Sequence, residues 1–238
     1  MIKPQQDSPV SKKLQVAKMF DNIAKSYDFL NHSLSFGMDF YWRKKAVSKL
    51  TNNPKKILDV ATGTADFAIA ATKMKEVQII GIDISEKMLE IGENKIKQKG
   101  LEKQIKLQLA DSENLPFESG SFDGITAGFG VRNFENLQLG LSEMCRVLKE
   151  GGIAVILEPS KPKAFPVKQI YSAYFHYILP FLGRLISKDN RAYNYLPESV
   201  DTFPENEKFI EILKVVGFTK AQHLPLTLGI VSLYIAIK

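Results

Sequence analysis

The sequence contains few of the residues on which several common kinds of protein depend. Cys145 is its one cysteine, so an internal disulfide or a metal site built from several cysteines is excluded. No apolar run reaches the roughly 20 residues that span a bilayer. The nearest candidate, residues 170–186, is interrupted by His176, Pro180 and Arg184. The first residues also lack the apolar centre of a signal peptide. Together these absences favour a cytoplasmic protein.

The rest of the composition is that of a globular protein, with one local excess of charge. The 238 residues are 45% hydrophobic and 24% charged, as expected for one substantial folded core. Residues 1–56 hold eleven Lys and Arg against four Asp and Glu. This stretch could dock on an anionic membrane surface, or it could be a merely solvated helical face. Its basic residues are not interleaved with aromatic ones, so we expect no nucleic-acid partner.

Apolar strands alternate with amphipathic helices through the middle of the chain. This alternation predicts a parallel sheet with helices on both faces. Gly151 and Gly152 are expected to end the last of these helices, and a turn at Pro225 is expected to join two final antiparallel strands. The expected strands are 56–61, 77–82, 105–110, 122–128, 153–158, 218–224 and 228–238, and the expected helices are 66–75, 86–99, 135–149 and 207–216.

Two segments fall outside this alternation. Residues 1–50 have helical periodicity and are predicted to form an N-terminal cap or lid on the main domain, residues 51–238. Residues 160–207 are rich in aromatic side chains, and we expect them to form a helical insertion over the substrate site.

Small and acidic residues follow three successive predicted strands. Gly63 lies in a tight turn between a strand and a helix, where backbone can approach a ligand. Asp83 ends the next strand, where an acid accepts ribose hydroxyls, and Asp111 with Ser112 follows the third strand. Each feature alone could be a packing glycine, a helix cap or a plain turn. Together they predict a cofactor that contains adenosine, because ligands bind at the carboxyl ends of strands in open α/β sheets.

The residues of the turn around Gly63 distinguish between two classes of cofactor that contain adenosine. A nicotinamide dehydrogenase normally has three glycines there, because a pyrophosphate lies against the backbone. This chain has Ala61 and Ala65 at two of those places and lacks a second mononucleotide-binding half. S-adenosylmethionine (SAM) has no pyrophosphate and needs a smaller cradle. We therefore predict SAM as the cofactor, and no metal.

Seven groups of residues carry a resemblance to a known family. Three of them are specific to it: Tyr-Asp-Phe-Leu-Asn at 27–31, Phe-Gly-Val-Arg-Asn at 129–133 and Tyr-Leu-Pro-Glu-Ser at 195–199. Others, such as 59–66 and 81–85, occur in SAM methyltransferases generally. On these segments the chain resembles the ubiquinone/menaquinone biosynthesis C-methyltransferases, which methylate the ring of a prenylated quinol.

The resemblance implies a fold, an activity and a set of contacts. The implied fold is a Rossmann-like α/β sheet of seven strands, whose last strand is antiparallel. In this family Thr64 would contact the methionine end of SAM, Asp83 the ribose, and Asp111 with Ser112 the adenine edge. Gly128, where some ubiquinone-forming members have serine, favours the branch that methylates demethylmenaquinol to menaquinol.

Methyl transfer to a ring carbon requires an electron-rich carbon, which a quinol provides once a hydroxyl ionises. A phenol has a pKa of about 10, so the site must stabilise the phenolate or supply a base. Arg132, at a predicted strand end, would stabilise the phenolate, and Asn133 could fix the second oxygen. Asp66 could orient Arg132 or a water. Tyr171 and His176 are rival bases, and positioning alone could suffice.

Several other functions stay open on the sequence alone. They are a ubiquinone-forming C-methyltransferase, a SAM methyltransferase of another small molecule, an RNA-directed enzyme or module, and a SAM-binding regulator without turnover. A prenylated substrate would bring the basic N-terminal stretch to the inner face of the membrane as a peripheral contact. Homo-oligomer formation is left open.

Overall fold

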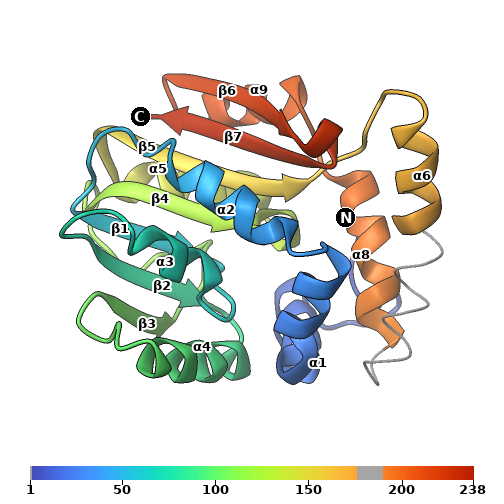
Figure 1. The fold of residues 1–238 in the computed structure, drawn as a ribbon, viewed down its shortest axis with the longest axis horizontal. Helices are drawn as coiled ribbons and strands as arrows, with labels where there is room; N and C mark the ends of the chain where they lie inside the picture. Colours follow the sequence, from blue (N-terminus) through green and yellow to red (C-terminus); the bar gives the residue numbers. More distant parts are fainter. Residues whose placement is uncertain (1, 176–189) are drawn as a thin grey trace.

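Seven strands form one sheet in the order β3-β2-β1-β4-β5-β7-β6 in the computed structural model, which describes residues 2–175 and 190–238 (Figure 1). β7 pairs antiparallel with β5 and β6, and the other pairs are parallel. The predicted seven-stranded sheet with an antiparallel last strand is therefore confirmed. The strands are β1 (Lys56–Val60), β2 (Gln78–Asp83), β3 (Ile105–Leu109), β4 (Phe122–Gly128), β5 (Leu148–Pro159), β6 (Lys220–Leu226) and β7 (Val231–Ile237).

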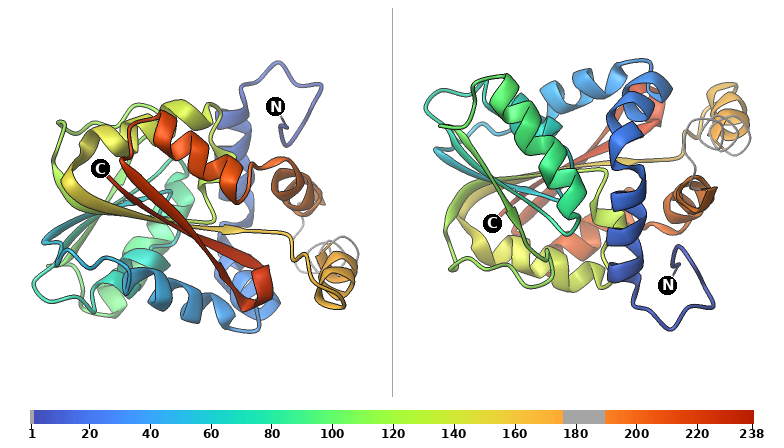
Figure 2. Two further views of the ribbon diagram at one scale, coloured as in Figure 1. Left: turned by 90° about the horizontal axis from the view of Figure 1, so that it is seen from above. Right: turned by 90° about the horizontal axis from the view of Figure 1, so that it is seen from below.

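Helices cover both faces of the sheet (Figure 2). Strands buried on both faces read as continuous apolar runs, with successive side chains pointing to opposite sides. On β5, Ile156 belongs to the core that includes α5 and α9, whereas Val155 belongs to the core that includes α2 and α3. The helices concerned are α2 (Met38–Val47), α3 (Asp66–Ala71), α4 (Glu86–Gln98), α5 (Leu137–Val147) and α9 (Glu207–Val215).

The N-terminal helix α1 (Lys12–Leu34) lies beyond the carboxyl ends of β1 and β2 (Figure 1). Ser11 caps it, its hydroxyl accepting from the Leu14 amide. Val16, Met19 and Ile23 recur at helical spacing and form one apolar cluster with Phe175 and Tyr195 from the aromatic insertion. The N-terminal helix α1 therefore packs against the predicted insertion.

The insertion contributes two described helices, α6 (Val167–Ala173) and α8 (Asn190–Thr202). Two short 3-10 turns complete the described elements, η1 (Val131–Asn133) after β4 and η3 (Thr227–Gly229) between β6 and β7. His176, one of the predicted rival bases, lies outside the described residues.

The structure corrects two expectations about turns. Gly151 and Gly152 lie in the first part of β5, where its register against β4 shifts, and α5 has already ended at Val147. Pro225 lies inside β6 and pairs with Ser232, while the turn is at η3. Proline is tolerated there because β6 is an edge strand, with one side free of ladder hydrogen bonds.

Candidate active site

The turn between β1 and α3 has an unusual backbone. Ala61, Gly63 and Ala65 all have positive φ, at 53°, 54° and 68°. Asp83, at the end of β2, holds this turn: its Oδ2 accepts from the Gly63 amide at 2.8 Å, and its Oδ1 accepts from the Ser85 amide at 3.0 Å. Burial raises the pKa of Asp83. Left-handed alanines cost free energy, so this shape is imposed by its surroundings, as is common at ligand sites.

A first cavity of about 650 Å³, counted to its open mouth, lies over this turn. Four of the predicted cofactor residues line it: Gly63, Asp83, Asp111 and Ser112. At the base of this cavity the backbone at Gly130 packs closely against Ala61. A Cβ added to Gly130 would lie 2.5 Å from that of Ala61. An acid at the second strand end and a small-residue floor fit an adenosyl cofactor such as SAM. The other lining residues are Lys13, Val16, Phe20, Tyr27, Ala61, Ile82, Ile84, Met88, Ala110, Glu113, Gly128, Phe129, Gly130, Asn133, Phe134 and Glu135.

Thr64 lies beside this cavity but is not among the residues that line it. It is 2% exposed, and its hydroxyl donates to Asp28 of α1 and accepts from Lys95 Nζ at 3.2 Å. Its contact with the methionine end of SAM therefore stays a prediction.

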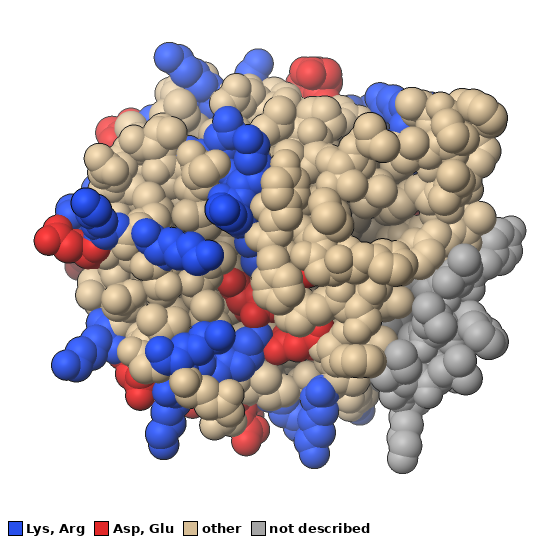
Figure 3. Space-filling view, in the orientation of Figure 1, with Lys and Arg blue, Asp and Glu red and all other residues tan. Residues whose placement is uncertain are grey.

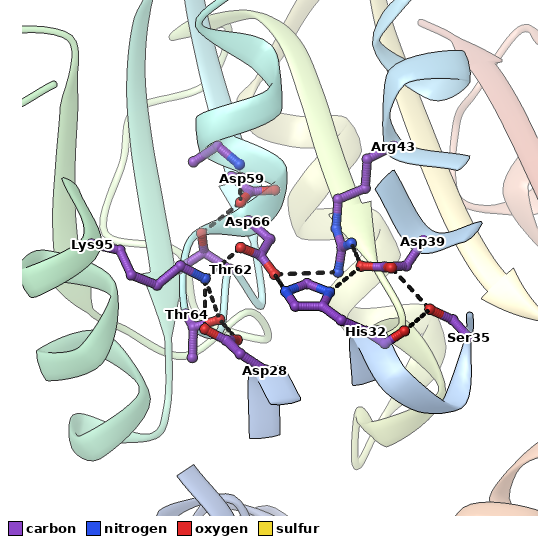
Figure 4. Close-up of polar contacts among 11 residues, drawn as sticks. Asp28, His32, Ser35, Asp39, Arg43, Asp59, Thr62, Thr64, Asp66 and Lys95 are labelled. Carbon is purple, nitrogen blue, oxygen red and sulfur yellow. Dashed lines mark hydrogen bonds and ion pairs between the residues drawn. The ribbon is translucent and has the colours of Figure 1, made fainter. Parts of the chain in front are cut away.

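Asp66 lies in a chain of charged groups from four helices (Figure 4). Its carboxylate binds the Lys95 ammonium, and its Oδ2 lies 3.5 Å from His32 Nε2. The Lys95 ammonium also binds Asp28 at 2.8 Å. Asp28, His32 and Asp66 bring ligand-type atoms within 4.8 Å of one another, but Lys95 already places a cation among them. These contacts tie α1 to the cofactor turn and leave Asp66 away from Arg132.

A second cavity of about 1120 Å³, again counted to its open mouth, adjoins the first. Its walls are mostly apolar and come from α1, α2, α6, α8 and the end of β5. Four residues line both cavities: Phe20, Tyr27, Phe129 and Asn133. The other lining residues are Met19, Ile23, Asn31, Leu34, Ser35, Asp39, Trp42, Arg43, Arg132, Pro159, Tyr171, Tyr174, Phe175, Tyr195, Leu196, Ile230 and Val231. Two ligands could therefore meet at the shared wall.

Arg132 projects into the second cavity and is held from behind by Glu158 at the end of β5. Arg132 Nη1 donates to Glu158 Oε2 at 2.9 Å, and the Arg132 amide donates to Oε1 at 3.2 Å. Burial raises the pKa of the fully buried Glu158, while Arg132 opposes that rise. Asp66 was expected to orient Arg132, but the carboxylate in contact with this guanidinium is that of Glu158.

Unpaired polar atoms gather in this cavity. Among the described residues, the buried side-chain atoms without a hydrogen-bond partner are Arg132 Nε, Asn133 Oδ1, Tyr171 Oη and Tyr195 Oη. All four residues line the second cavity. Burial raises the pKa of Tyr195 to about 12 and also raises the pKa of Tyr171, so both phenols are neutral donors. Unpaired buried polar groups are costly, so this cluster fits a cavity that binds a polar group.

Some site residues were missed by the sequence analysis. Glu158 ends a buried apolar strand, which is the same signal that singled out Asp83. Tyr27 opens the family-specific segment 27–31, but Phe20 gave no comparable signal, because aromatic residues at helical spacing usually belong to a core. Their place between two cavities follows from how α1 crosses the sheet.

A sheet of this order, with an acid at the end of β2 and a small-residue turn after β1, defines the SAM-dependent methyltransferases. One similar structure is a SAM-dependent methyltransferase from Thermotoga maritima, described as a possible histamine N-methyltransferase. It has a TM-score of 0.65 and 18% sequence identity, and the match covers 93% of this chain and 99% of that chain. At this identity the likeness shows the fold alone.

The sequence relatives then give the family. The chain belongs to the ubiE/COQ5 methyltransferase family, whose sequence profile matches residues 8–238. A demethylmenaquinone methyltransferase of Bacteroides fragilis is 50% identical over 226 residues, which are 94% of this chain and 92% of that protein. The protein of the same name from Porphyromonas gingivalis is 43% identical over 235 residues, 98% of this chain and 96% of that one. The predicted family and SAM-dependent methyl transfer are confirmed.

Proposed function

We propose that the protein transfers the methyl group of SAM to a ring carbon of a prenylated demethylmenaquinol, giving menaquinol. The observation that carries this proposal is the group of four unpaired polar atoms in an apolar cavity next to the cofactor site. A quinol offers two hydroxyls on a flat apolar ring and so needs both donors and acceptors. Two relatives with 50% and 43% identity bear the name of this activity.

The residues of the cavity suggest how the ring is held. Arg132 Nε and the neutral phenols of Tyr171 and Tyr195 can donate to the quinol oxygens, and Asn133 Oδ1 can accept from the second hydroxyl. A guanidinium beside one oxygen lowers the cost of ionising it, which raises electron density on the neighbouring ring carbon. Phe129 and Tyr27, which line both cavities, would keep water from the reacting carbon.

The cofactor side follows from the first cavity. Asp83 would accept from the ribose hydroxyls, and Asp111 with Ser112 would contact the adenine edge. Gly63 gives backbone access near the sulfur, and Thr64 is proposed to act at the methionine end. Bound SAM would supply the methyl group: the new bond to the ring carbon would form as the sulfur–methyl bond breaks, and the ring proton would then pass to water or back to the phenolate oxygen.

The test is a product assay with methyl-labelled SAM and a reduced demethylmenaquinone that has a short prenyl chain. We expect label on a ring carbon. Arg132→Ala should lower turnover by about 100-fold or more, as expected for loss of a group that stabilises developing charge, with SAM affinity within about twofold. Arg132→Lys keeps a charge but loses the planar donor fork, so its turnover should lie between the two.

Other products would contradict the proposal. Label on an oxygen, or label on a benzoquinol and none on the naphthoquinol, would assign a different acceptor. Unchanged turnover in Arg132→Ala would remove that residue from the mechanism.

A prenylated acceptor also bears on where the enzyme works. Its chain lies in a bilayer, and none of the described helices is long and apolar enough to cross one. We therefore propose that the protein meets its substrate as a peripheral protein at the inner face of the membrane.

A further inference from the structure

Five large apolar side chains are exposed at three places that lie on one side of the molecule. Phe36 is 84% exposed, Phe165 82%, Leu228 74%, Ile170 66% and Phe40 57%. They come from the junction of α1 and α2, the segment before and within α6, and the turn η3. We call these five residues the apolar rim.

Three members of the apolar rim lie next to residues that line the second cavity. The ring of Phe36 lies 6.4 Å from that of Tyr174, a lining residue. Ile170 precedes the lining residue Tyr171, and Leu228 lies two residues before Ile230, which also lines the cavity. The α1–α2 junction, α6 and the β6–β7 turn lie side by side in Figures 1 and 2.

Backbone strain presents two of these side chains to solvent. Phe36 has a φ of 52° and Leu228 a φ of 56°, a left-handed conformation that bulky residues rarely adopt. Asparagine or glycine would suit either position better. An exposed large apolar residue in this conformation lowers the stability of the fold through backbone strain and through the loss of apolar burial. Such a combination is typical of a functional position.

Lysines lie beside the apolar rim, and the acids Asp201 and Glu205 lie close enough to Tyr171 to add to the rise in its pKa that burial causes. Lys44, Lys163 and Lys168 are exposed beside the apolar rim, and residues 160–175 contain no acidic residue. At the α1–α2 junction the acid is Asp39, which is 3% exposed and bound to Arg43. Figure 3 shows a broad, largely uncharged surface over α6 and the β6–β7 turn. An apolar surface bordered by lysines suits an anionic lipid surface.

The basic N-terminal stretch is less available than its composition indicates. The Lys12 ammonium is buried against the carbonyls of Arg132 and Phe134, and Lys13 pairs with Asp111. On the basis of the proposed function, we propose that the apolar rim is the surface that docks on an anionic bilayer, with Phe36 and Leu228 inserted among the lipids. In this pose the mouth of the second cavity faces the hydrocarbon, so a prenyl chain can enter without crossing water.

The experiment compares the full chain with the double variant Phe36→Asn and Leu228→Asn. Asparagine tolerates the left-handed backbone, so the fold should be kept while the apolar groups are lost. Val215→Asn is the matched control, because Val215 is 76% exposed on α9, away from the apolar rim. Each protein is sedimented with phosphatidylcholine/phosphatidylglycerol vesicles and assayed with the short-chain acceptor free in solution.

We expect the double variant to bind vesicles about tenfold or more weakly, since two buried apolar groups are lost. The control should bind like the parent, and all three proteins should methylate the soluble acceptor equally. Vesicle binding by the double variant at the parent's level would overturn the docking surface, as would a parent that stays in the supernatant. The docking surface is also overturned if the substitutions only split a dimer in light scattering. Failure of the proposed function is distinguished by the methylation assay, in which the soluble acceptor would then carry no label with the parent protein.

Discussion

At the scale of single residues, the Arg132–Glu158 pair sets which polar groups the second cavity presents to a ligand. Glu158 is fully buried and accepts a hydrogen bond from Nη1 of Arg132, while Arg132 Nε has no partner. A buried guanidinium without a counter-charge would be expensive, and one bonded on all sides could not bind a ligand. Glu158 is thus a positioning residue that turns a fixed edge of Arg132 toward the cavity.

Replacing Glu158 tests this positioning role. Glu158→Gln keeps the shape but weakens a charge-assisted hydrogen bond, so we expect kcat to fall by about tenfold while SAM affinity is unchanged. Glu158→Ala should also lower the free energy of unfolding, by about 3–5 kcal/mol, because it leaves Arg132 buried without its counter-charge. Single-turnover kinetics and urea unfolding measure the two effects. An unchanged or raised kcat in Glu158→Gln would show that Arg132 needs no such support.

Asp59 on β1 gives a prediction about pH. It is fully buried and accepts hydrogen bonds from Thr62, Thr126 and the Ala68 amide, and burial raises its pKa to about 6. The folded state therefore binds its proton more tightly than the unfolded state, where a pKa near 3.9 applies. Its contribution to stability is full below about pH 4 and is lost as the pH rises through about 6.

The variant Asp59→Asn removes this titration. The free energy of unfolding of the parent, relative to Asp59→Asn, should fall by about 2 kcal/mol between pH 4 and pH 7. Urea unfolding at several pH values measures the difference. Parallel pH profiles for the two proteins would mean that Asp59 is not titrating in this range.

At the scale of elements, α1 controls both cavities. Its first turn lies at the end of the first cavity that Asp111 lines, where Lys13 Nζ lies 2.5 Å from Asp111 Oδ2 and 3.3 Å from Glu113 Oε2. Further along the helix, Phe20 and Tyr27 line both cavities. The first turn of α1 therefore forms part of the wall of the first cavity.

Removing the ion pair at Lys13 should loosen this part of the wall. Lys13→Met should speed SAM release by up to about fivefold, the range expected for a partly exposed ion pair. Lys18→Met, at an exposed position on the same helix, is the matched control. Stopped-flow displacement of SAM measures the rates. Equal release rates in the two variants would show that α1 does not limit cofactor exchange.

The elements themselves were largely predictable. Strand and helix periodicities differ clearly in this chain, so every predicted strand is present, and the helix 86–99 matches α4 to within one residue. The wrong predictions concern glycine and proline, which are compatible both with a turn and with an irregular or edge strand. Gly151 has positive φ but lies in a strand with shifted register, and Pro225 sits in an edge strand. Sequence cannot say which strand will be the edge.

At the scale of the whole molecule, the residues predicted as an N-terminal cap take two different places. Trp42, Ala46 and Val47 of α2 belong to the main core of the sheet, whereas Val16 and Ile23 of α1 pack with the aromatic insertion. The second cavity lies between these two groups of packed residues. Its position depends on the crossing of α1 over the strand ends, which is a long-range property.

Local sequence is enough to set the sheet, the small-residue turn after β1 and the acid that ends β2, because these depend on periodicity and on residue type at strand ends. Tertiary packing is what places Glu158 rather than Asp66 against Arg132, turns Thr64 toward Asp28, and brings four unpaired polar atoms into one cavity. Those contacts join residues far apart in the chain. Their geometry is set by the packing of helices on strands, which no local pattern encodes.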